Sequence, residues 1–234
     1  MVEANVKIIE ELKYFLKVVS TDASIRKLVT QSDVDFSRDR KLPMERIAAL
    51  IINMPKRSLS FDSLEEGLES STKGAFSLQR TKLQALFFQV WNKWLVDCYY
   101  HYYGAKVKRW RGFLLQAVDG SMAYLMNKKE VVEYFGTQDN QHVPVPMARV
   151  MQVPDILNDI TVWGDIRPIS ESEQAIMAGR VGQLHEDSLT LFDRGFPSYA
   201  LMYLMLNEET HRHFVMRCKV GFNKEVKQFV YSRK

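Results

Sequence analysis

Apolar residues in roughly the first 110 positions recur at the three- and four-residue spacing of helices. One such stripe comprises Val6, Ile9, Leu12, Leu16 and Val19. Spacing of this kind places the apolar side chains on one face, so a buried helix is predicted here. A second helix is predicted over residues 44–51, because Pro43 stands where proline commonly opens a helix and the apolar run ends before Pro55.

Two more helices are predicted between residues 61 and 94. A short one carries Phe61, Leu64 and Leu68, a turn of Ser, Thr and Gly follows at 70–74, and a long helix spans 76–94. This order of a short helix, a turn and a long helix is typical of a helix-turn-helix. Arg80 and Lys82 lie off the apolar stripe, so we expect them to contact DNA. The alternative is the ordinary solvated basic face of an amphipathic helix.

The pattern changes at Gly112. Residues 113–118 form a short, nearly continuous apolar run, which is typical of a strand buried on both faces and stops at Asp119. Further strands are predicted at 145–152, 160–169, 189–192, 214–219 and 226–231, with helices at 130–135, 171–184 and 197–206. The predicted fold is therefore an all-helical region, residues 1–110, followed by a mixed sheet with helices packed on it, residues 111–234.

Composition favours a folded globular chain over a disordered one, with 46% hydrophobic and 26% charged residues. The two cysteines, Cys98 and Cys218, lie far apart, so neither a disulfide framework nor a thiolate zinc site is expected, and a reducing cytoplasm fits. The longest apolar run, residues 199–206, is much shorter than the roughly 20 residues of a membrane-spanning helix. No membrane association is expected.

Charge is distributed unevenly along the chain. Up to Arg111 there are 19 Lys and Arg against 13 Asp and Glu, whereas the remainder has 13 against 15. A basic first half and a slightly acidic second half suit a polyanion-binding region joined to a carboxylate-bearing one. Ordinary surface charge is the alternative.

Two aspartates follow predicted strands. Asp119 and Asp193 taken singly would be read as turn formers or helix caps. However, the stretches LLQAVDGS (114–121) and LTLFDRGFPS (189–198) resemble the two aspartate motifs of the insertion-sequence-four family of DDE-type transposases. The upstream stretches RKLP (40–43) and TKGAFS (72–77) are similar to that family as well, so the resemblance runs from about residue 40 to the end.

The resemblance implies a specific chemistry. It implies an RNase H-like core in which Asp119 and Asp193 are catalytic metal ligands for Mg²⁺, with Mn²⁺ as a substitute. Two such ions roughly 3.5–4 Å apart suit DNA strand cleavage and transfer. Arg194 is expected to contact a DNA phosphate, the alternative being a surface arginine. The implied partners are insertion-sequence ends and target DNA, with a homodimer on paired ends as one arrangement, and the implied location is the nucleoid.

The third carboxylate of the family, a glutamate on a later helix, has no counterpart that we find before Lys234. The core is therefore expected to be incomplete at its C-terminus, as in a truncated transposase. One alternative is a non-enzymatic DNA-binding fragment that inhibits a full-length transposase. The other is a self-sufficient nuclease in which Glu225 supplies the third ligand, although Glu225 is better explained as a solvated edge residue.

Overall fold

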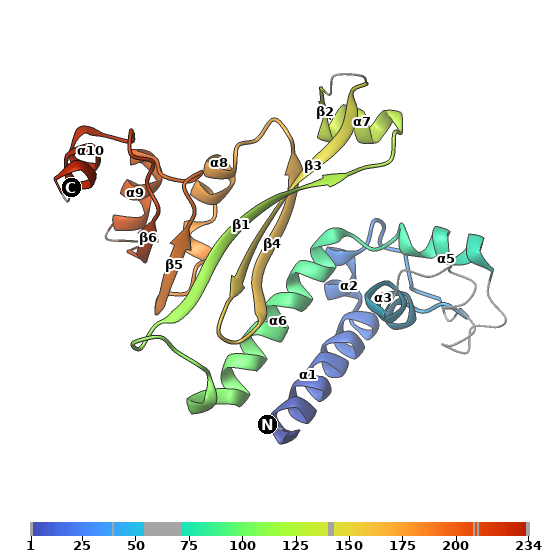
Figure 1. Cartoon of the computed structure of the whole chain (residues 1–234). Coiled ribbons are helices and arrows are strands. Elements are labelled where there is room, and N and C mark those ends of the chain that lie inside the picture. The colour runs from blue at the N-terminus through green and yellow to red at the C-terminus, as the bar shows by residue number, and fades with distance from the viewer. Residues whose placement is uncertain are drawn as a thin grey trace. The chain divides into compact units, whose positions relative to one another are not determined.

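The protein forms two compact units, Met1–Gly104 and Ala105–Lys234 (Figure 1). The structure, a computed structural model, describes residues 2–38, 40–53, 72–139, 143–207, 209 and 211–232. The predicted short helix with Phe61, Leu64 and Leu68 lies outside the described residues. Each unit is described by itself.

The first unit is helical. Among its described residues the α-helices are α1 (Val2–Thr21), α2 (Ala23–Val29), α3 (Met44–Asn53), α5 (Lys73–Arg80) and α6 (Ala85–Tyr103). The two long helices α1 and α6 lie side by side (Figure 1) and are joined by a hydrogen bond of 2.8 Å from the Tyr102 hydroxyl to Glu11. The centre of this unit is apolar, with Ile47, Ala48 and Phe87 fully buried.

The predicted long helix over residues 76–94 is wrong. The chain leaves helical geometry between α5 and α6, and Leu83 forms a β-bridge with Thr30. The Gln31 amide donates to the Lys82 carbonyl and the Gln84 amide to the Val29 carbonyl, both at 2.9 Å. Pairing with a segment some fifty positions earlier replaces the local helical bonds, so the break depends on tertiary structure.

The second unit contains a six-stranded mixed sheet. Its strands are β1 (Leu114–Tyr124), β2 (Thr137–Gln138), β3 (Val145–Asp155), β4 (Ile160–Pro168), β5 (Ser188–Phe192) and β6 (His213–Met216). They are ordered β2-β3-β1-β5-β6, and β4 pairs with β3 as well. The β1, β3 and β4 strands are successively antiparallel, whereas β5 is parallel to both β1 and β6. The predicted combination of helices and a mixed sheet is confirmed.

Helices α8 (Glu173–Ala178) and α9 (Tyr199–Leu206) pack on one face of this sheet. They bury Val118 of β1, Met151 of β3 and Phe192 of β5 together with their own Met177 and Met205. Because side chains alternate along a strand, the residues next to Val118 along β1 face the other side.

Two more α-helices complete the described part of this unit, α7 (Lys129–Phe135) and α10 (Lys224–Tyr231). The predicted strand over residues 226–231 is therefore wrong. Asn223 accepts a hydrogen bond of 2.8 Å from the Val226 amide and so caps α10, while Val226, Phe229 and Val230 recur at helical spacing. None of the described helices is both long and apolar enough to cross a membrane.

Candidate active site

Asp119 lies in the middle of β1, so the prediction that it ends a strand is wrong. The parallel ladder between β1 and β5 ends with the pair Val118 and Phe192. The antiparallel ladder with β3 continues along the other edge of β1 to Tyr124. The apolar run therefore stops where pairing with β5 stops, although the strand itself continues on β3.

Asp193 follows the last residue of β5 and begins a tight turn. Its Oδ1 accepts a hydrogen bond of 2.7 Å from the Gly195 amide. Phe196 is almost fully buried and lies 5.6 Å from the Phe192 ring, so it anchors the turn in the core. A Cβ at Gly195 would lie only 3.0 Å from Asp193 Oδ1, hence a side chain there would crowd the carboxylate.

The sheet register brings the two aspartates together. Val118 and Phe192 are the last partners of the parallel ladder, and the next residue on each strand is one of the aspartates. Both are exposed. The nearest described donor to Asp119 is Gln152 Nε2, at 3.4 Å from Oδ2. Hard carboxylate oxygens at one end of the parallel ladder are suitable ligands for Mg²⁺ or Mn²⁺.

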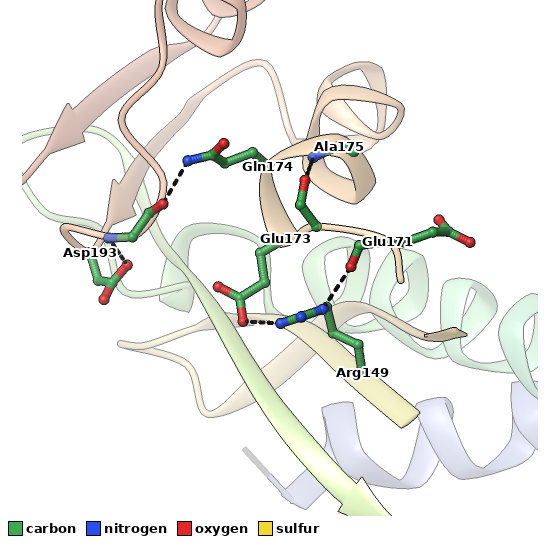
Figure 2. Close-up of polar contacts among 8 residues, drawn as sticks. Arg149, Glu171, Glu173, Gln174, Ala175 and Asp193 are labelled. Carbon is green, nitrogen blue, oxygen red and sulfur yellow. Dashed lines mark hydrogen bonds and ion pairs between the residues drawn. The ribbon is translucent and has the colours of Figure 1, made fainter. Parts of the chain in front are cut away.

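Glu173 is a residue of this region that the sequence analysis missed. A Cβ at Gly120 would lie 2.5 Å from Glu173 Oε1, so a side chain at this position would displace this carboxylate from its place against β1. Arg149 donates from Nη1 to Glu173 Oε1 and from Nε to the Glu171 carbonyl, both at 2.8 Å (Figure 2). The charge of Glu173 is thereby compensated.

Glu173 does not complete a carboxylate triad with the aspartates. Gly120 and Asp119 are neighbours on a strand, and successive positions on a strand face opposite sides of the sheet. The Asp119 side chain therefore lies on the face opposite to the one that Gly120 presents. Glu173 belongs to the α8 face. Within the described parts of the chain, no group of three or more His, Cys, Asp or Glu side chains is arranged to hold a metal ion.

Arg194 is exposed in the turn after Asp193, and it lines a pocket with Lys219 and Phe222. Both of the pocket's cations therefore lie in the unit that carries the aspartates. The sequence signal that identified Arg194 was its place in the Asp-Arg-Gly motif. Lys219 had no such signal, because it follows a different strand, β6.

Arg80 and Lys82 do not share one helix face, because the break after α5 separates them. Arg80 is exposed at the end of α5, with Cζ 5.9 Å from the centre of the Phe76 ring. Lys82 is less accessible, and its Nζ lies 3.7 Å from Asp35 Oδ1. Asp35 partly neutralises Lys82, so Arg80 is the more available cation.

Comparison with known proteins finds a distant similarity and no match to a protein-family model. The chain is 26% identical over 110 residues to a protein of Escherichia coli (strain K12) described as "Putative transposase InsZ". The aligned part is 46% of this chain and 37% of that protein. This similarity supports a transposase-like relationship.

Gly120→Ala should destabilise the protein by about 1–3 kcal/mol, because the added methyl overlaps the Glu173 carboxylate. In a Glu173→Ala background, Gly120→Ala should lower the free energy of unfolding by much less. Gly182→Ala is the matched control, since a Cβ there meets no atom within 4 Å. Urea unfolding of the four chains and the control measures the coupling. An equal cost in both backgrounds would show that Glu173 does not require glycine at this position.

Proposed function

We propose that this chain is part of a DDE-type insertion-sequence transposase, with the second unit forming an RNase H-like core. The observation that carries the proposal is that Asp119 and Asp193 each directly follow the last residue pair of the parallel β1–β5 ladder, Val118 and Phe192. The strand arrangement supports it: β1, β3 and β4 form an antiparallel meander, and β5 and β6 then run parallel to β1. The similarity to the Escherichia coli protein agrees with this proposal.

The two aspartates fit a Mg²⁺ site as a partial ligand set. Each is exposed, and each retains oxygen atoms that no described side chain engages closely. Bound Mg²⁺ would supply charge stabilisation at the phosphate and an activated oxygen nucleophile. The role of Asp119 and Asp193 is to fix the ligand oxygens at one place on the sheet. The Gly195 amide holds the Asp193 carboxylate in a single orientation.

Arg194 is proposed to hold a phosphate of the cleaved strand. It immediately follows Asp193, and its side chain is exposed beside the turn that orients this carboxylate. A guanidinium can donate two parallel hydrogen bonds to a phosphate, which fixes the orientation of the phosphate as well as its position.

A second candidate is a DNA-binding protein without catalytic activity, which inhibits a complete transposase. The observation that favours it is the lack of a third ligand among the described residues near the two aspartates. Glu225 lies in the first turn of α10, and within the described residues it belongs to no group of three potential metal-ligand side chains.

Mn²⁺ binding tests the carboxylate site. Asp119→Asn and Asp193→Asn should each weaken Mn²⁺ binding at least about tenfold, because each removes a charged ligand. Electron paramagnetic resonance of free Mn²⁺ gives the affinity directly. Glu225→Gln is the control and should leave the affinity unchanged. Unchanged binding in both aspartate variants would contradict the site, and a loss in Glu225→Gln would make Glu225 a ligand.

Cleavage distinguishes the two candidates. The chain is incubated with labelled DNA of the terminal repeats flanking its gene and with Mg²⁺ or Mn²⁺. Metal-dependent nicking that Asp193→Asn abolishes would favour the enzyme, whereas binding without nicking would favour the non-enzymatic alternative.

DNA affinity should depend more on Arg80 than on Lys82. Arg80→Ala should weaken binding and reduce the slope of log affinity against log salt by about one, as expected for one lost phosphate contact. Lys82→Ala should have a smaller effect, because Asp35 already partly neutralises this lysine. Lys93→Ala, which removes an exposed lysine paired with Asp97, is the control. Equal losses in all three variants would contradict a specific role for Arg80.

A further inference from the structure

A pocket opens beside the turn that carries Asp193. Its volume is about 360 Å³, which is within the roughly 300–1,000 Å³ of small-molecule sites. Three segments of the second unit form it, and the residues used below are Gln174 of α8, Arg194 and Gly195 after β5, and Lys219, Gly221 and Phe222 after β6. The aspartate proposed as a metal ligand is therefore hydrogen-bonded to a residue of the pocket wall, Gly195.

The charge of the pocket is positive. Arg194 and Lys219 both line it, and none of the described residues that line it is Asp or Glu. Neither cation forms an ion pair with another described residue, so both are available to a ligand. Gly221 adds no side chain on this side, and a Cβ there would meet no atom within 4 Å. Two cations with open space between the segments that carry them suit a phosphate group.

One wall of the pocket is an aromatic ring that packs against a second ring. Phe222 lies 5.2 Å from the Tyr199 ring, with an interplanar angle of 35°. The Tyr199 hydroxyl accepts a hydrogen bond of 3.2 Å from Asn223 Nδ2, and the Phe222 amide donates to the Lys219 carbonyl at 2.9 Å. A ring fixed before binding loses little freedom when a base stacks on it.

Gln174 ties the pocket to α8. Its Nε2 donates to the Gly195 carbonyl at 2.8 Å, while the preceding residue, Glu173, reaches the other way to Arg149 (Figure 2). Beyond the end of α8, Arg180 Nη2 donates to Asp165 Oδ2 of β4 at 3.0 Å. Both ends of this helical segment are thus fixed to the sheet, so Gln174 presents a rigid edge.

We propose that this pocket binds one unpaired nucleotide of a DNA strand, with its phosphate between Arg194 and Lys219 and its base against Phe222. The inference rests on the proposed function, because the adjacent Asp193 makes this nucleotide a neighbour of the bond that is cut. A duplex end opened at the cleavage point would supply it. Cations and a stacking ring together are the usual combination for single-stranded nucleic acid.

Binding of a fluorescein-labelled oligothymidylate, with chelator present and no added metal, tests the proposal. Phe222→Leu should weaken binding of this single strand about 5- to 100-fold, as expected for the loss of one stacked base. It should leave binding of a blunt duplex of the same length unchanged. Tyr203→Leu, which removes an exposed ring of α9 outside the pocket, is the matched control and should change neither.

Arg194→Ala and Lys219→Ala together should reduce the salt slope of single-strand binding by about 0.7, because the two side chains are proposed to hold one phosphate and each neutralised phosphate of a single strand contributes about 0.7. Arg217→Ala is the control, because Arg217 is an exposed arginine outside the pocket. As a single substitution in the otherwise unchanged chain it should leave this salt slope unchanged. Thermal unfolding verifies that every variant is folded.

Three outcomes would overturn the nucleotide proposal. In the first, Phe222→Leu weakens binding of the single strand and of the duplex equally. In the second, only the Arg194 and Lys219 variants lose affinity for the single strand, and in the third no pocket variant loses affinity. Failure of the proposed function is distinguishable, because Mn²⁺ binding by Asp119 and Asp193 is measured without DNA and strand binding is measured without metal.

Discussion

The parallel pairing of β1 with β5 is the constraint on which the candidate site depends. It ends with Val118 and Phe192, both of which are buried beneath α8 and α9. Because this apolar pair fixes the register, the next residue on each strand is carried to the same end of the ladder. A shift of either strand by one residue would turn its apolar side chain out of the core, so the burial of Val118 and Phe192 also determines where Asp119 and Asp193 lie.

The position of α8 is constrained by a contact with β1, the strand that carries Asp119. Glu173 lies against Gly120, and Arg149 from the neighbouring β3 strand compensates its charge. The glycine after Asp119 is therefore required by a close contact within a continuing strand, not by a turn. Since the same helix also holds Gly195 through Gln174, its packing affects both the strand with Asp119 and the turn with Asp193.

The sequence predicts the order of strands and helices in the second unit well, because buried strands there are short apolar runs. It fails where long-range pairing decides local structure. The break between α5 and α6 depends on a bridge from Thr30 to Leu83, and the continuation of β1 past Asp119 depends on β3. The error at residues 226–231 has a different cause, because the signals for a helix there are local. They are the cap at Asn223 and the helical spacing of the apolar residues, and the strand prediction followed the apolar content instead. The two aspartates were identified by their motifs, whereas Glu173, Lys219 and Phe222 are brought to the region by tertiary structure alone.

The turn after β5 connects two different chemical requirements. In the proposed function, Asp193 presents carboxylate oxygens to a DNA strand that carries negative charge, so an uncompensated acidic strand end would repel the proposed substrate. Placing Arg194 directly after Asp193, with Lys219 from the adjacent β6 connection in the same pocket, supplies positive charge beside the carboxylates without an ion pair to either cation in the described residues. The buried Phe196 then fixes the whole turn to the core. One short segment can in this way orient the acidic group, attract the anionic strand and remain rigid, which explains why Asp, Arg, Gly and Phe occur there in succession.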